Sequence, residues 1–202
     1  AEACVASENE PGDILLQGTL FADYPQRENF LLVAAWWRAA GLRESLLYAA
    51  ARTFFVARHR LENAHAHDGV TWWNDSKATN FHAAEAAVAR FQQPVLIILG
   101  GKSKGGDIAG FVRRLAPRVR HAALLGETRH ALADACAAAG VAFTVCPDLA
   151  EAVRALAALA VPGDHVLLSP GFASLDQFKS YADRGDQFVN LVRNLAPFAV
   201  GR

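Results

Sequence analysis

The sequence contains no methionine, and its three cysteines, Cys4, Cys136 and Cys146, are widely spread. An odd number of cysteines without paired metal-binding spacing argues against a disulfide scaffold, so we expect these residues to act as small hydrophobic side chains in a reduced protein. No apolar run approaches the roughly 20 residues that a membrane-spanning helix needs. Residues 1–11 carry acids but no basic segment followed by an apolar one, so they do not resemble a secretory signal. We therefore expect a cytoplasmic protein. The missing initiator methionine indicates either a piece of a longer protein or removal of the first residue by processing.

The chain has no net charge, because 20 lysine and arginine residues balance 20 aspartate and glutamate residues. Without an overall field, we expect neither nucleic acid nor a membrane as a partner, and any site for an anion must be local. With 202 residues, the chain can form one good-sized domain, or one domain and part of another.

From about Gly69 onward, short β-type apolar runs alternate with longer alanine-rich amphipathic stretches. This alternation is typical of repeated βα units around a parallel sheet. The predicted strands cover residues 70–73, 95–99, 121–125, 142–146 and 165–169, and the predicted helices cover residues 81–91, 108–115, 128–139, 149–159 and 174–195. The fold class is therefore α/β, with a Rossmann-like, mostly parallel sheet flanked by helices.

Residues 1–57 do not continue this pattern. Residues 13–21 indicate a pair of strands, whereas residues 29–40 and 44–51 indicate a helix hairpin broken at Gly41. This stretch is too short to bury a core of its own, which indicates the tail of a domain whose main body lies upstream.

The junction between the two parts is expected at residues 54–58. Residues 63–68 follow it and read as a polar turn. We interpret His65 and His67 as solvated loop histidines rather than metal ligands.

Residues 74–80 form the most informative segment of the chain, because an acid, two hydroxyls and a lysine are packed into one strand-to-helix turn. Such a turn can present a cation and several hydrogen-bond donors to an anionic ligand. The alternative is a purely structural role, in which Asp75 or Ser76 caps the helix that follows.

The loops after the second and last predicted strands, residues 100–107 and 169–177, hold most of the remaining polar motifs. In an open α/β sheet the carboxyl ends of the parallel strands meet at one edge, where ligands bind, so these loops are expected to converge with residues 74–80. The loops after the third and fourth strands are interpreted as ordinary helix starts, with Thr128 and Asp148 as caps.

The segment Leu-Gly-Gly-Lys-Ser at residues 99–103 has the order of a P-loop but fails on its spacing. A P-loop needs a glycine five residues before the one that precedes the lysine, and Leu96 occupies that position. We interpret residues 100–107 as a glycine loop that presents one or two lysines to a carboxylate or phosphate, the alternative being a solvated turn.

Three motifs, in this order along the chain, resemble the Mur ligases. They are Asn-Asp-Ser-Lys-Ala-Thr-Asn at 74–80, Gly-Gly-x-x-Lys-Gly-x-Asp at 100–107, and Ser-Pro-x-x-Ala-Ser-Leu-Asp-Gln-Phe at 169–178, followed by Arg184, Gly185 and Phe188. The first is similar to the version found in the branch of the family that adds D-glutamate. The resemblance covers essentially the whole chain as the final part of a longer enzyme.

The resemblance implies a division of the chain. His-Arg-Leu-Glu at 59–62 is similar to the family's hinge, so residues 1–57 would be the tail of the central ATP-binding domain plus a linker. Residues 58–202 would be the complete carboxyl-terminal domain. The UDP-binding domain, the P-loop and most Mg²⁺ ligands would lie upstream, so this chain is expected to hold no metal site.

The resemblance also implies substrates and roles. The reaction would use ATP to join D-glutamate to UDP-N-acetylmuramoyl-L-alanine through an acyl phosphate, and this chain alone, without its other domains in cis, would be inactive. The expected ATP contacts are Asn29, Arg60 and Asp75, and the expected substrate contacts are Lys77, Thr79, Lys104, Ser174, Leu175 and Tyr181. Asp176, Arg184 and Phe188 are expected to fix the last loop and helix, and Trp36, Trp37, Trp72 and Trp73 to pack within the elements that carry them.

The sequence departs from the family pattern at several positions. Pro25-Gln26 replaces a His-Asn pair, which weakens the nucleotide half of the prediction. Ser103 replaces an acid and Lys102 is an extra cation, so the choice between Lys102 and Lys104 as the substrate lysine stays open, with Lys104 preferred. Tyr181 keeps the ring of a family aromatic but adds a hydroxyl.

Two other functions stay open. A sister amide ligase of the folylpolyglutamate type would share the architecture, but its Asp-x-Ala-His-Asn-Pro turn is not found here. A freestanding α/β module that binds a nucleotide or an amino acid would use the same loops without chemistry.

Overall fold

The computed structural model describes residues 13–22, 26–55 and 57–195. These residues belong to two compact units, Ala1–Ala57 and Arg58–Arg202, and each unit is described by itself. Cys4 and Pro25, which carried predictions, lie outside the described residues. No helix among the described residues is long and apolar enough to cross a membrane.

The described residues of the first unit form three helices, α1 (Asp13–Leu16), α2 (Gln26–Ala39) and α3 (Glu44–Thr53). The strand pair predicted over residues 13–21 is therefore wrong, because Leu16 is fully buried from a helix against α2 and α3. The small core consists of Leu16, Phe30, Ala34, Leu47, Tyr48 and Ala51. Trp37 packs against this core, whereas Trp36 is 62% exposed, so the packing role expected for Trp36 is not seen.

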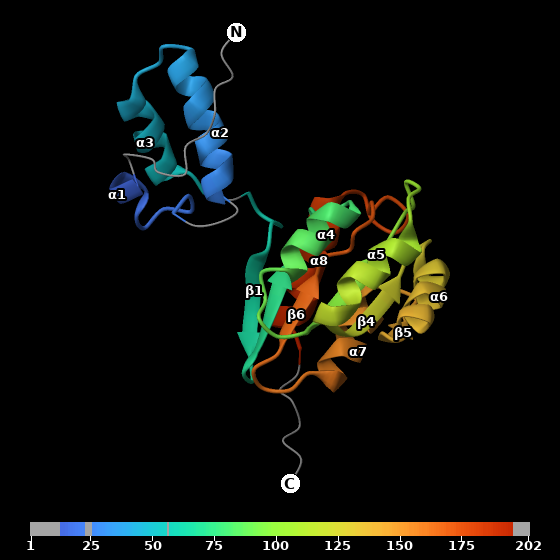
Figure 1. Cartoon of the computed structure of the whole chain (residues 1–202). Helices are drawn as coiled ribbons and strands as arrows, with labels where there is room; N and C mark the ends of the chain where they lie inside the picture. Colours follow the sequence, from blue (N-terminus) through green and yellow to red (C-terminus); the bar gives the residue numbers. More distant parts are fainter. Residues whose placement is uncertain (1–12, 23–25, 56, 196–202) are drawn as a thin grey trace. The chain divides into compact units, whose positions relative to one another are not determined.

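The second unit is built around one six-stranded sheet in the order β1-β2-β6-β3-β4-β5 (Figure 1). The strands are β1 (Glu62–His67), β2 (Val70–Asn74), β3 (Val95–Gly100), β4 (Val119–Leu125), β5 (Ala142–Val145) and β6 (His165–Leu168). Strand β1 is antiparallel to β2, and every other pair is parallel. The predicted Rossmann-like, mostly parallel sheet is confirmed.

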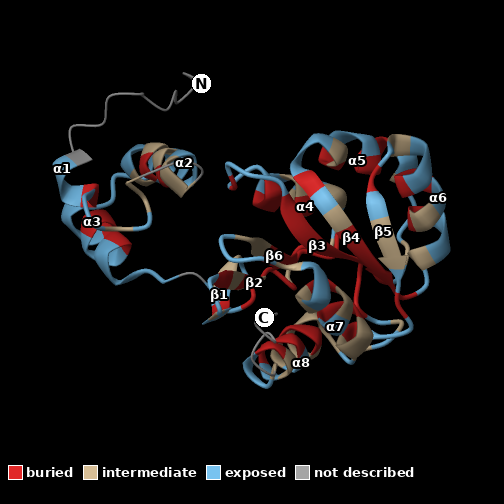
Figure 2. Ribbon diagram, turned by 90° about the horizontal axis from the view of Figure 1, so that it is seen from below, coloured by how far each residue is buried: buried red, intermediate tan, exposed pale blue. Residues whose placement is uncertain are grey.

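Helices cover both faces of this sheet, as Figure 2 shows, with α4, α5 and α6 on one side and α7 and α8 on the other. Their bounds are α4 (Phe81–Val88), α5 (Ile108–Leu115), α6 (Arg129–Ala139), α7 (Leu149–Leu159) and α8 (Tyr181–Arg193), with a short 3-10 turn at Ala116–Arg118. All six residues of β3 are buried, because side chains on both of its faces meet helices. Ile97 and Leu99 pack on the α4–α6 side, and Leu96 and Ile98 on the α7–α8 side.

The prediction of a polar turn at residues 63–68 is wrong. Residues Glu62–His67 form strand β1, which pairs with β2 and buries Ala64. His65 and His67 are half-buried and their rings stack, with centroids 5.7 Å apart. Among the described residues, no group of three or more potential metal ligands comes together.

Of the three expected helix starts, one agrees with the structure, because Asp148 caps α7 by accepting a hydrogen bond from the Glu151 amide. The other two differ. The Thr128 hydroxyl instead donates to the Gly101 carbonyl, so it joins two loops. The last helix begins at Tyr181 with Ser180 as its cap, because residues 174–180 form an irregular connection rather than the first turns of a helix.

The sheet order decides where the polar loops lie. Strand β6 lies between β2 and β3, so the loops that follow β2, β6 and β3 leave three neighbouring strands at the same edge. These are the three loops that carry the motifs, and their convergence follows from parallel pairing.

Candidate active site

Asp75, the first residue after β2, is buried and bound from two sides. Its Oδ1 accepts a hydrogen bond from the Leu61 amide at 3.1 Å, and its Oδ2 accepts one from the Ser169 hydroxyl at 2.7 Å. Burial raises the pKa of this carboxyl to about 6, against the opposing effect of both hydrogen bonds and of Arg60. The alternative that Asp75 or Ser76 caps the next helix is wrong, because Asn80 caps α4 by accepting from the Ala83 amide.

This pKa has a testable consequence for stability. The folded pKa of about 6 lies above the ordinary value of 3.8, so the unfolded chain loses this proton first and stability falls as the pH rises from about 4 to about 6. Asp75→Asn keeps an acceptor for Leu61 and removes the ionisation. In urea denaturation, we expect the wild type to lose about 2 to 3 kcal/mol relative to Asp75→Asn between pH 4 and pH 7. Parallel stability curves for the two proteins would contradict a buried, titrating Asp75.

Arg60 is held at the rim of the site by an unusual backbone. The residues on either side, His59 and Leu61, have positive φ values of 67° and 45°. Such conformations are costly for residues other than glycine. Two hydrogen bonds offset this cost here, since the His59 amide donates to the Glu62 carboxylate and the Leu61 amide donates to the Asp75 carboxylate. The Arg60 side chain itself is exposed beside Asp75.

The first cavity at this edge, of about 290 Å³, brings together five of the predicted site residues. They are Arg60, Asp75, Lys77, Thr79 and Tyr181, and Asn80 also contributes to the lining. The ammonium of Lys77 lies 5.4 Å from the centre of the Tyr181 ring, within the range of a cation–π contact. A cation, an anion and an aromatic ring therefore share one small cavity.

The second cavity, of about 230 Å³, lies where the loops after β2, β3 and β6 meet. Its lining includes Thr79, Asn80, Lys102, Lys104 and Phe172. Thr79 and Asn80 line both cavities, so the two adjoin at these residues. Both lysines of the glycine loop line the second cavity, and the preference for Lys104 as the substrate lysine stays a prediction.

The glycine loop is paired to the last loop through its backbone. The Lys102 amide donates to the Ala173 carbonyl at 2.8 Å. At the preceding Gly101, φ is +142° and an added Cβ would lie only 2.2 Å from the Ala173 oxygen. A glycine is required at this position, because any side chain would push the two loops apart.

Arg184 joins the loops after β2 and β6 from within the protein. Its buried guanidinium donates to the hydroxyl and carbonyl oxygens of Ser76 at 3.0 and 2.9 Å and to the Phe172 carbonyl at 3.3 Å. Burial lowers the pKa of Arg184 to about 10, so it remains a cation at neutral pH. The prediction that Arg184 fixes the last loop is confirmed.

Three predicted site residues lie outside both cavities. Ser174 is buried and Leu175 is 64% exposed, and neither lines a cavity. Asn29 lies on α2 in the first unit, where its amide donates to Gln26 at 3.2 Å. Sequence reasoning missed Asn80, which lines both cavities. Its place at the end of the 74–80 motif was the available signal.

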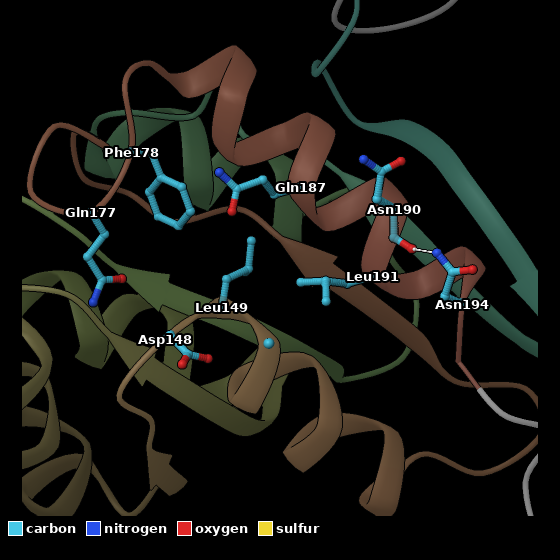
Figure 3. Close-up of a pocket in the computed structure, with 9 residues that line it drawn as sticks. Asp148, Leu149, Gln177, Phe178, Gln187, Asn190, Leu191 and Asn194 are labelled. Carbon is cyan, nitrogen blue, oxygen red and sulfur yellow. Dashed lines mark hydrogen bonds between the residues drawn. The ribbon is translucent and has the colours of Figure 1, made fainter.

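A further cavity, of about 600 Å³, is a separate groove between α7 and α8 (Figure 3). In Figure 3, Gln187 and Leu191 of α8 lie opposite Leu149 at the start of α7. No lysine or arginine lines this groove, and the Gln177 amide is bonded to the Pro147 carbonyl. The groove therefore lacks the charges that the strand-edge cavities offer to an anion.

The fold and the two cavities define a class of protein: an α/β domain with lysine-lined cavities at the carboxyl edge of its sheet. The family model described as Mur ligase, glutamate ligase domain matches residues 59–172, and the chain belongs to this family. The resemblance seen in the three sequence motifs is confirmed.

Curated relatives carry the name UDP-N-acetylmuramoylalanine–D-glutamate ligase. The protein of Chlamydia abortus is 42% identical over 149 residues, which cover 74% of this chain and 35% of the relative. The protein of Thermobifida fusca is 41% identical over 175 residues, which cover 83% of this chain and 37% of the relative. The chain thus spans little more than a third of the length of these relatives.

Solved structures support the fold. The UDP-N-acetylmuramate–alanine ligase MurC of Thermotoga maritima superposes over 84% of this chain and 38% of its own, with a TM-score of 0.60 and 12% identity. FolC of E. coli, solved with DHPP and ADP, superposes over 84% of this chain and 40% of its own, with a TM-score of 0.60 and 22% identity.

Proposed function

We propose that this chain is the carboxyl-terminal part of an ATP-dependent ligase that adds D-glutamate to UDP-N-acetylmuramoyl-L-alanine in the cytoplasm, during the synthesis of peptidoglycan precursors. The identity of 42% to a relative with this name supports the substrate. The observation that carries the proposal is the pair of adjoining cavities, since one holds Arg60, Asp75 and Lys77 and the other holds Lys102 and Lys104.

In the proposed reaction, the carboxylate of the UDP-linked substrate takes the γ-phosphoryl group of ATP, and ADP leaves. The amine of D-glutamate then attacks the acyl carbon, loses a proton, and the carbon–oxygen bond to phosphate breaks. Negative charge gathers on the phosphate oxygens throughout, so the contribution of this chain is electrostatic. Lys77 would stabilise that charge from the first cavity, and Lys104 would hold a carboxylate of D-glutamate in the second.

Thr79 lies at the boundary between the two cavities. Its hydroxyl would therefore face the point where the amine meets the activated carboxyl group. Arg60 would contact the nucleotide phosphates or ribose, and Asp75 would use its remaining lone pairs to accept from ribose hydroxyls. Tyr181 would fix the direction of Lys77 by its cation–π contact.

The remaining parts of the enzyme are proposed to lie upstream. Residues 1–57 would be the tail of the central ATP-binding domain, with Asn29 as a contact to adenine, and residues 58–202 the carboxyl-terminal domain. The P-loop and the Mg²⁺ ligands would come from the upstream part. This chain alone would then bind ligands without turning them over.

A second candidate is a folylpolyglutamate-type ligase, favoured by the superposition on FolC of E. coli. The seven-residue turn at 74–80 argues against it, because it does not contain the Asp-x-Ala-His-Asn-Pro pattern of that type. A freestanding binding module is the third candidate.

Release of phosphate from ATP by the full-length protein tests the proposal. We expect release only when UDP-N-acetylmuramoyl-L-alanine and D-glutamate are both present, and not when L-glutamate replaces the D-isomer. Release with a folate substrate would support the sister ligase, and no release with either set would support a binding module.

A further inference from the structure

The glycine loop after β3 presents two lysines to the same cavity. Lys102 and Lys104 both line the second cavity, together with Thr79 and Asn80 of the loop after β2. Lys102 is bridged to Ala173 in an antiparallel manner, so its backbone is fixed against the last loop. The position of Lys102 at the cavity is therefore defined by a sheet-like contact rather than by a free loop.

Among the described residues, no carboxylate lies within ion-pair distance of either lysine, and none lines the cavity. The nearby acids are Glu127, which accepts from the Ser103 amide, and Asp107, which caps α5 at Gly110. Two cations that line one small cavity are matched best by a ligand with two negative charges.

We propose that Lys102 is a specificity-determining residue, which binds a second carboxylate so that the pair Lys102 and Lys104 selects an amino acid with two carboxylates. The inference rests on the proposed function and goes beyond it, since one lysine would be enough to hold an amino acid by one carboxylate. An amide in place of the second carboxylate leaves one lysine without its partner, and the loss of a charge-assisted hydrogen bond lowers affinity.

Steady-state kinetics of the full-length protein test this role with D-glutamate and D-glutamine as competing acceptors. Lys102→Ala is expected to lower kcat/KM for D-glutamate at least about 10-fold, and kcat/KM for D-glutamine much less, so the preference for the diacid falls. Lys102→Arg should restore most of the preference, because it restores the charge. Lys179→Ala, an exposed lysine outside both cavities, is the matched control and should leave both values unchanged.

Three results would overturn the proposal. Lys102→Ala could keep the preference for D-glutamate, could lose activity equally with both acceptors, or could raise KM for ATP instead, which would assign Lys102 to a phosphoryl group. A melting temperature equal to that of the wild type shows that the variant is folded.

A binding measurement separates this inference from the proposed function. Calorimetry with glutarate and butyrate compares a dicarboxylate with a monocarboxylate and needs no turnover. If the wild type does not turn over D-glutamate, the proposed function fails, whereas tighter binding of glutarate that depends on Lys102 still supports this inference. Equal binding of glutarate by the wild type and Lys102→Ala contradicts it.

Discussion

Replacing Lys77 or Lys104 with alanine is expected to lower kcat/KM of the full-length enzyme by about 100-fold or more, without changing the fold. Each lysine lines one of the two adjoining cavities, where charge would change during the proposed reaction. Because water is largely displaced from a filled site, the loss of one cation there costs more than the loss of a surface charge. Measurement of phosphate release at several concentrations of each substrate checks the result.

The two substitutions should differ in which kinetic parameter changes. Lys104→Ala is expected to raise KM for D-glutamate, because Lys104 would hold this substrate in both the ground state and the transition state. Lys77→Ala is expected to act mainly on kcat. Lys179→Ala again serves as the control for loss of a positive charge. If both variants retain wild-type turnover, the assignment of the two cavities to the reaction is wrong.

Replacing Arg184 with leucine is expected to destabilise the protein by about 3 kcal/mol or more. The substitution leaves the hydroxyl and carbonyl of Ser76 and the carbonyl of Phe172 without their donors in a buried place. Each unpaired buried group costs about 1 to 3 kcal/mol, although the removal of a desolvated charge offsets part of the loss. Urea denaturation of the 202-residue chain measures the difference.

Arg184→Lys and Arg193→Leu complete this experiment. Lysine keeps the charge but cannot reach both loops with one planar group, so we expect a loss of about 2 kcal/mol and a folded protein even if the leucine variant does not fold. Arg193, in the last turn of α8, is exposed, and its replacement should change stability by less than about 0.5 kcal/mol. Equal stability of all the variants would show that Arg184 does not hold the two loops together.

The parallel strands and the helices between them could be predicted because their apolar runs are long and clear. Helices α5 and α7 begin and end at the predicted residues. Strand β1 was missed because its sequence, Glu-Asn-Ala-His-Ala-His, is polar and has only alanines to bury. An edge strand is stabilised by its backbone pairing with one neighbour, which the composition of a segment does not reveal.

The candidate site, like the fold, could be predicted only in part from the sequence. The 74–80 motif could be predicted to lie at the candidate site because it follows a predicted strand and is one of three motifs that resemble the same family, whereas its composition alone also allowed a helix cap. That Asp75 is buried against Ser169 could not be predicted, since this contact depends on β6 lying next to β2. For the same reason, the sequence could not show that Lys102 and Lys104 reach a common cavity, which depends on the pairing of Lys102 with Ala173. The ligand roles of all these residues remain predictions.

The placement of β6 between β2 and β3 also affects how the chain acquires its structure during synthesis. Both neighbours of β6 leave the ribosome long before it does, because β6 is the last of the six strands to be made. Until then, β2 and β3 each have an unpaired inner edge with apolar side chains, which is the kind of edge that pairs with other chains. Nascent chains that stall before residue 165 should therefore be prone to aggregation, and the sheet edge that holds the two cavities should form only in the final step of folding.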